Sequence, residues 1–192
     1  MVTKTENQIW AFLIKQINQF LIDRGYRTVD ASGNYKSGWQ VSRNYQPTIQ
    51  GLVDEMIYLT KVSRRRYGTQ GLVQEKDQNG DWQAVDDWIE EHLIQVSAFK
   101  TRNPAQETAD TITSTDIICE LQAFINSALK VEEWKRAGYE VIKSTDIREL
   151  DYETDSGLNE KLPQFDFLLV VSQKIFNKIQ KISKIDITTK RI

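Results

Sequence analysis

Two alternating segments on either side of a turn most constrain the fold of this 192-residue chain. In "DEMIYLTKVSRR" (54–65) and "DDWIEEHLIQVSAFKTR" (86–102), apolar and polar residues fall on two alternating faces, which is typical of strands. Between them, "RYGTQGLVQE" (66–75) is a further extended segment, and Asn79-Gly80 is a strong hairpin signal. The sequence therefore predicts an antiparallel meander over 54–101 with a protruding hairpin over 67–88.

Two other segments have the apolar spacing of amphipathic helices. The first covers residues 5–26, where Gly25 stands at the expected end. The second begins at Thr113 or Ser114, either of which can cap it, and "VEEWKRAGYEV" extends it until Gly138. Each helix is expected to bury one stripe of Ile, Leu and Phe side chains.

The remaining segments complete an α+β domain. Residues 28–51 are rich in Gly, Asn, Ser and Gln, which predicts a long loop with at most one short strand. Two strands are expected in 139–150 and 163–176, with an acidic turn between them, and 175–192 is interpreted as a strand or extension. One domain over 1–192 follows, with two main helices packed on one mostly antiparallel sheet.

Composition excludes several classes of protein. The net charge of −2 and the pI near 5.6 do not fit a duplex-binding domain with a strongly basic face. The single cysteine, Cys119, allows no internal disulfide and no CxxC zinc site, and it is expected to be buried as a small apolar residue. The apolar residues near position 10 are spaced and do not have the layout of a signal peptide, and no apolar run is long enough for a membrane-spanning helix to be expected.

Catalytic patterns are weak. The one histidine, His92, lies in an alternating strand between acidic residues and is expected to be structural. A metal-dependent nuclease would need a carboxylate and a lysine on adjacent strands, and neither Asp54 with Lys61 nor Asp166 with Lys174 has the required spacing. The sequence therefore predicts no catalytic residues, no metal and no cofactor.

The triplet Arg64–Arg66 is the most distinctive charged feature. On a strand, Arg64 and Arg66 share one face and Arg65 takes the other. The acidic stretch 85–91 is expected to lie across the hairpin and neutralise part of this charge, so ion pairs within the sheet or between subunits are favoured over phosphate contacts.

The order of motifs resembles that of a known family. It begins with "IWAFLIKQINQFL", passes through "RNYQPT" and "KVSRRRYGTQ", and continues with "TADTITSTDIICELQAFINS" and the pair "STDIREL" and "PQFDFLLVV". Over roughly residues 6–175 the chain resembles the neck or tail terminator proteins of tailed bacteriophages. These are sequence patterns and not catalytic motifs, so they indicate a family without an active site.

The resemblance implies a virion structural protein, made in the host cytoplasm and not an enzyme. It implies a ring, usually a hexamer, that ends tail-tube polymerisation. The implied partners are other copies, the tail tube protein and a neck or connector protein, with weak contact to passing DNA and none with a membrane. Another connector, tail or baseplate component is the alternative, ahead of a nuclease. The candidate interface residues are Arg64, Arg65, Arg66, Tyr67, Gln70, Asn79, Trp82, Asp86 and Asp87.

Trp88 has two interpretations that the sequence leaves open. It can anchor a partner as part of the docking hairpin, because aromatic residues are common interface anchors. It can equally fill the core. Trp82, beside Gly80 and Asp81, is expected to be exposed.

Overall fold

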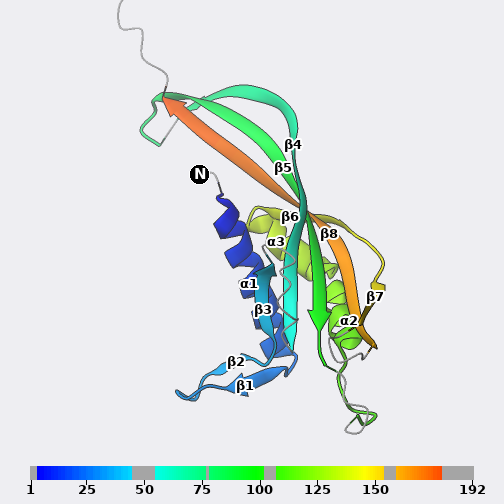
Figure 1. The fold of residues 1–192 in the computed structure, drawn as a ribbon. Coiled ribbons are helices and arrows are strands. Elements are labelled where there is room, and N and C mark those ends of the chain that lie inside the picture. Colours follow the sequence, from blue (N-terminus) through cyan, green and yellow to red (C-terminus); the bar gives the residue numbers. More distant parts are fainter. Residues whose placement is uncertain (1–3, 45–54, 77, 102–106, 154–158, 179–192) are drawn as a thin grey trace, which may run out of the picture.

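The computed structural model describes residues 4–44, 55–76, 78–101, 107–153 and 159–178, and it has an α+β architecture (Figure 1). A mixed sheet has helices packed on one face. Its strands over 56–76, 82–99 and 159–178 continue past the helices, and this protruding part of the sheet is called the arm (Figure 1). The described helices are α1 (Glu6–Asp23), α2 (Ser114–Ile125) and α3 (Ala128–Arg136). The described strands are β1 (Arg27–Val29), β2 (Tyr35–Ser37), β3 (Gln40–Asn44), β4 (Met56–Lys76), β5 (Trp82–Phe99), β6 (Tyr139–Ser144), β7 (Arg148–Glu153) and β8 (Asn159–Lys178).

The main sheet has the strand order β3-β4-β5-β8-β6. β7 pairs with the first part of β8 and β6 with a later part, so β6 and β7 share one edge of the sheet. Every pair is antiparallel except β3 with β4. The mostly antiparallel sheet predicted from the alternating segments is confirmed.

The core lies between the sheet and the helices. Even-numbered residues of β5 from Ile94 to Ala98 face it, together with odd-numbered residues of β8 from Phe165 to Val171, and all are nearly inaccessible. α1 contributes the stripe that its spacing predicts: Ile9, Trp10, Leu13, Ile17 and Leu21. Alternation in the strands and a period near 3.6 in the helix thus place one apolar set in a common core.

Capping residues set where the helices begin. Thr5 caps α1 and Thr113 caps α2, each through a capping box that is completed by the side chain three residues later. The prediction of one second helix that ends at Gly138 is wrong, because the helix is interrupted at Asn126 and Ser127, which separate α2 from α3. Asn126 Nδ2 donates to Ser144 Oγ at 2.6 Å, a tertiary bond that ties this break to β6.

The predicted loop over 28–51 is also wrong for its described part. β1 and β2 form a small hairpin, and β3 lies parallel to the start of β4, from Gln40 beside Met56 to Asn44 beside Thr60. Parallel pairing depends on a distant partner, so the polar local composition does not reveal it. Residues 45–54 lie outside the described residues, as does 179–192 of the predicted C-terminal extension.

The predicted meander over 54–101 is instead one long antiparallel hairpin of two strands. β4 is one continuous strand that pairs with β5 from Met56–Phe99 to Lys76–Trp82, with register shifts between Lys61 and Ser63 and between Tyr67 and Gly71. β8 pairs with β5 along the arm as far as Lys178 opposite Gln83, so the protruding unit has three strands (Figure 1). The acidic turn predicted over 151–163 is shorter, since β7 and β8 pair up to Glu153 and Asn159.

No described helix is both long and apolar enough to cross a membrane.

Candidate functional site

The arm presents large side chains to solvent at its end and along its outer face. Gly80 has a φ of 82°, which the predicted hairpin turn requires. Trp82 is 51% exposed, with Lys76 Nζ 5.3 Å from its ring centroid, and Asn79 is exposed in the turn. Tyr67 is also exposed, directly opposite Ile89 of β5. The predicted exposure of Trp82 is therefore confirmed.

Three predicted interface residues cannot be placed as side chains. Gln70, Asp86 and Asp87 lie in β4 and β5, but their side chains fall outside the described part of the structure. Their backbone positions put Asp86 opposite Leu72 and Asp87 opposite Gly71. Their role in an interface stays a prediction.

A bulge at Val62 sets the direction of the arginines. Lys61 pairs with Ile94 and Ser63 with Leu93, so one extra residue shifts the alternation of β4. Beyond the bulge, Arg64 and Arg66 face the helix side of the sheet, as His92 and Glu90 do in β5. The sharing of one face by Arg64 and Arg66 was predicted, but which face it is depends on the bulge.

The three arginines have different contacts. Arg64 Nη2 donates to Glu90 Oε1 at 2.7 Å, which confirms an ion pair within the sheet. The Arg66 guanidinium lies 4.3 Å from the Trp88 ring centroid. Arg65 Nη1 donates to the Tyr67 hydroxyl at 2.8 Å. Arg65 and Arg66 are exposed, and within the described residues no carboxylate lies within 4 Å of either guanidinium.

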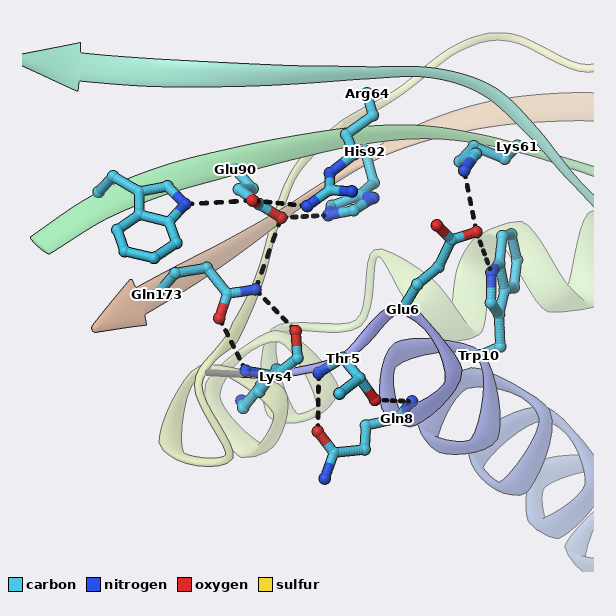
Figure 2. A network of polar contacts seen from close by, with 11 residues as sticks. Lys4, Thr5, Glu6, Gln8, Trp10, Lys61, Arg64, Glu90, His92 and Gln173 are labelled. Atoms are coloured by element: carbon cyan, nitrogen blue, oxygen red, sulfur yellow. Dashed lines mark hydrogen bonds and ion pairs between the residues drawn. The ribbon is translucent and has the colours of Figure 1, made fainter. Parts of the chain in front are cut away.

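A buried polar network lies where the arm leaves the body (Figure 2). Glu90 is its centre and is only 5% exposed. Its Oε1 accepts from Arg64 and, at 3.1 Å, from Trp88 Nε1. Its Oε2 lies 3.5 Å from Gln173 Nε2 and 3.4 Å from His92 Nε2. This last contact lacks hydrogen-bond geometry, and His92 Nε2 has no hydrogen-bond partner within the described residues.

Burial and hydrogen bonding oppose each other at Glu90. Burial alone raises the pKa of Glu90, but hydrogen bonds from Arg64 and Trp88 outweigh it, so the pKa is below its ordinary 4.5. For His92, burial is the largest effect and lowers the pKa below 6.5, while nearby Glu90 opposes that change. The network therefore contains an ionised carboxylate and a neutral imidazole near pH 7.

The same network anchors the N-terminal segment. Gln173 of β8 is 1% exposed and bonds twice to the backbone of Lys4: its Oε1 accepts from Lys4 N at 2.7 Å, and its Nε2 donates to Lys4 O at 3.0 Å. Lys4 Nζ donates to the carbonyls of Ala137 and Gly138 and lies 3.6 Å from the Tyr139 ring centroid. The start of α1, the end of α3 and the arm are thus joined.

A second cluster lies on the first turn of α1. Glu6 Oε1 accepts from Lys61 Nζ at 2.9 Å and from Trp10 Nε1 at 3.3 Å, and it forms an ion pair with Arg43. The hydrogen bond from Lys61 is the main cause that lowers the pKa of Glu6 from 4.5 to about 2, although burial acts in the opposite direction. This cluster links α1 to β3 and β4 just below the arm.

Acid should weaken the fold through Glu6. A carboxyl whose pKa is depressed on folding stabilises the protein above its unfolded pKa, near 4.5, and that stability is lost as the pH falls towards about 2. Partial solvent screening limits the contribution to roughly 1 kcal/mol. Glu6→Gln should therefore reduce the loss of unfolding free energy between pH 5 and pH 2.5, as measured by urea denaturation. An unchanged pH profile would contradict this role of Glu6.

Other predicted residues have structural positions. Trp88 is 8% exposed with its indole bonded to Glu90, so it belongs to the buried arm base and not to a free docking surface. His92 is buried, as its structural interpretation predicts. Cys119 is exposed, so its predicted burial is wrong: it lies on the outer side of α2, between the buried Ile118 and Leu121.

The nuclease residues form no metal site in the described chain. Asp166 Oδ2 pairs with Arg148 at 2.7 Å and its Oδ1 accepts from Gln95, while Lys174 lies farther along the same strand. Asp54 lies outside the described residues. Among the side chains that the structure describes, no group of three or more His, Cys, Asp and Glu could hold a metal ion.

Sequence reasoning missed the two residues that fix the arm. Gln173 and Lys4 are far apart in the chain, and neither has a local motif. A weak signal was present at Glu90 and Gln173, polar residues at buried positions of alternating strands, because a buried polar side chain needs a partner.

Comparison with known proteins bears on the whole domain. The model of the family described as "E217 gateway protein gp29" matches residues 8–181, which includes every described helix and strand except the first residues of α1. A search of curated proteins returned no match. The match agrees with a phage neck protein and does not distinguish a tail terminator. The chain belongs to the family of the E217 gateway protein gp29, a family of bacteriophage structural proteins of the head–tail region.

Proposed function

We propose that this protein forms a closed ring, of six copies, at the head-proximal end of the phage tail tube. There it ends tube polymerisation and joins the tail to the neck. Membership of a gateway family supports a position where the two parts of the virion meet. The single observation that carries the proposal is the three-stranded arm, which projects from a helix-covered body and ends in an exposed tryptophan.

The arm suits a protein that works through surfaces. Its base is held by the Glu90 network, so its direction is set before a partner binds. Preorganisation of this kind lowers the entropy cost of association. Exposed Trp, Tyr and Arg residues are common anchors in interfaces, and the arm carries Trp82, Tyr67 and Arg65. Other copies, the tail tube protein and a neck connector are the partners we propose.

Solution mass tests the ring directly. Light scattering across a concentration series, with negative-stain images of the same sample, should show a closed particle of about six copies. If the protein is monomeric, purified tail tubes are added and examined for caps at one end. A monomer that leaves tube ends bare would contradict the proposal, and unassisted growth into tubes would favour a tube component instead.

Trp82 provides a sharper test of the arm. Trp82→Ala should weaken ring assembly or tube capping by roughly thirtyfold, which corresponds to about 2 kcal/mol for a hot-spot side chain. Its melting temperature should match wild type, because Trp82 is half exposed. Leu129→Ala on α3 is the matched control, since Leu129 is 83% exposed but lies on the body. Equal assembly by both variants would remove Trp82 from the interface.

Contact with DNA is proposed to be weak. The chain is net acidic, and within the described chain two of the basic side chains of the arm base, Arg64 and Lys61, form ion pairs with Glu90 and Glu6. Binding to duplex DNA should therefore be barely detectable at physiological salt, in contrast to the steep salt dependence of proteins with many phosphate contacts. The site of action is the virion neck, after synthesis in the host cytoplasm.

A further inference from the structure

The described sheet has one basic edge at the base of the arm. Residues 61–66 contain Lys61, Arg64, Arg65 and Arg66 and no acidic residue. β3 covers the outer edge of β4 only from Met56 to Thr60, so in the described chain the backbone of β4 has no strand partner on that side from Lys61 onwards. An unpaired strand edge presents N–H and C=O groups that readily accept another strand.

The opposite edge of the same sheet is acidic. β7 contains Glu149, Asp151 and Glu153 and one basic residue, Arg148, which forms an ion pair with Asp166 of β8, and within the described residues β7 pairs only with β8. Glu149 is exposed and engages Lys161 Nζ at 2.5 Å. β7 lies on the far side of β5 and β8 from β4 (Figure 1). One chain therefore cannot bring its own two edges together, but two neighbouring copies can.

We propose that the β4 edge at Lys61–Arg66 docks against the acidic β7 edge of a second copy of this chain. This inference rests on the proposed ring. Two different patches meet in such a contact, which makes it heterologous, the type of interface that builds rings. Because β4 is antiparallel to β5, β5 to β8 and β8 to β7, the two edges run antiparallel when both copies point the same way.

Unpaired charge supports this choice of partner. Within the described chain, Arg64 and Lys61 already have carboxylate partners, whereas Arg65 and Arg66 are exposed and contact aromatic rings. Their guanidinium groups keep donors available for a carboxylate, which Arg can grip with two hydrogen bonds. A neighbouring strand rich in Asp and Glu supplies that chemistry.

The two edges differ in height along the sheet. Arg65 pairs with Glu91 of β5, which in turn pairs with Val170 of β8. Glu149 of β7 pairs with Pro163 of β8, so the two edges are offset by seven residues along β8. That corresponds to about 23 Å at the usual rise per residue. Strands inclined to the ring axis produce such an offset between neighbours, as in closed barrels.

Charge exchange tests the pairing. Arg65→Glu with Arg66→Glu makes the β4 edge acidic, and Asp151→Lys with Glu153→Lys makes the β7 edge basic. Each double variant alone should assemble about a hundredfold more weakly than wild type, because like charges would then face each other. An equimolar mixture should recover rings, since each variant edge then meets an edge of opposite charge. These rings must alternate, as native mass spectrometry with one isotope-labelled variant can show.

Controls keep the result specific. Lys15→Glu with Arg136→Glu changes the net charge by the same amount as the arginine double variant, at exposed helix positions, and should leave assembly unchanged. Far-UV circular dichroism and the melting temperature check the fold. If the arginine double variant melts early, Arg65→Glu alone repeats the test, because its one polar side-chain contact within the described residues is with Tyr67.

The outcomes separate the inference from the proposed function. The paired edges would be supported if the wild type forms rings, each double variant alone assembles more weakly, and the mixture of the two variants forms rings again. If the wild type forms rings and both variants alone form them equally well, the strand pair is overturned while the ring proposal stands. The same holds if the wild type forms rings but the mixed variants do not. Wild-type protein that forms no ring, in solution or on tube ends, would overturn both.

Discussion

Trp134→Ala should lower the free energy of unfolding by about 3–5 kcal/mol, the largest effect expected from a single change in the body of the protein. Trp134 on α3 is 1% exposed. Its ring lies edge-on to Phe12 at 5.3 Å and to Phe124 at 6.0 Å between centroids, and its Nε1 donates to Gln16 Oε1 at 3.3 Å. Alanine would leave a cavity between α1, α2 and α3 and remove the partner of Gln16.

Equilibrium urea unfolding measures this loss, and Leu129→Ala is again the matched control on the same short helix. Leu129 is 83% exposed, so its replacement should change the unfolding free energy by no more than about 0.5 kcal/mol. Domains of this kind are stable by only about 5–15 kcal/mol, so the Trp134 variant should lose a large fraction of its stability. A loss below about 1 kcal/mol would show that the helices repack around the cavity.

The local rules explain why much of the body could be predicted. The start of α1 at Glu6 and of α2 at Ser114 follows from capping threonines, whose hydrogen bonds are made within a few residues. The alternation in β5 places Ile94, Val96 and Ala98 inside because side chains change sides at every residue. Features of this kind depend on neighbours in sequence.

The features that could not be predicted depend on distant partners. Helix α3 separates from α2 at Asn126, whose side chain bonds to Ser144 of β6, and polar composition hid the parallel pairing of β3 with β4. The bulge at Val62 decides which face Arg64 takes. Strict alternation along β4 would place Arg64 on the face opposite to that of Leu59, but the extra residue at Val62 places both on the same face.

The candidate interface divides in the same way. Exposure of Trp82 follows from its position after a Gly80 turn, and it could be predicted. The separate roles of Arg64 and Arg65 could not, because they depend on Glu90 being buried across the hairpin. Arg64→Glu would place a second carboxylate beside Glu90 and test the arm base itself, so Arg65 is the better probe of assembly.

Glu90→Ala should destabilise the base of the arm by about 2–4 kcal/mol. The change removes the acceptor shared by Arg64 and Trp88 Nε1 and takes a neighbour from Gln173. Arg64 is half exposed and can be hydrated instead, which places the cost below that of a fully buried ion pair. The Trp88 indole and the Gln173 amide are buried, so they cannot recover the lost contact from water as easily.

Hydrogen exchange can locate this effect. Backbone amides of β5 and β8 near Glu90 and Gln173 should exchange faster in Glu90→Ala, while the core strands around Ile94 stay protected. Glu91→Ala is the control one position away, on the opposite face of the strand, and should stay within about 0.5 kcal/mol of wild type. Equal exchange in the two variants would show that the network does not hold the arm.

The charge of Glu90 can be separated from its hydrogen bonds by pH. Because the pKa of Glu90 is below 4.5 in the fold, its contribution is complete above pH 4.5 and is lost as the pH falls further. The pKa of His92 is below 6.5, so the contribution from its neutral form is lost as the pH falls below 6.5. Glu90→Gln keeps an acceptor for Arg64 and Trp88 but abolishes the carboxylate titration. Its stability should therefore depend less on pH below 4.5. Because the variant lacks the carboxylate that favours protonated His92, the loss of stability that His92 causes between pH 6.5 and pH 5 should remain visible.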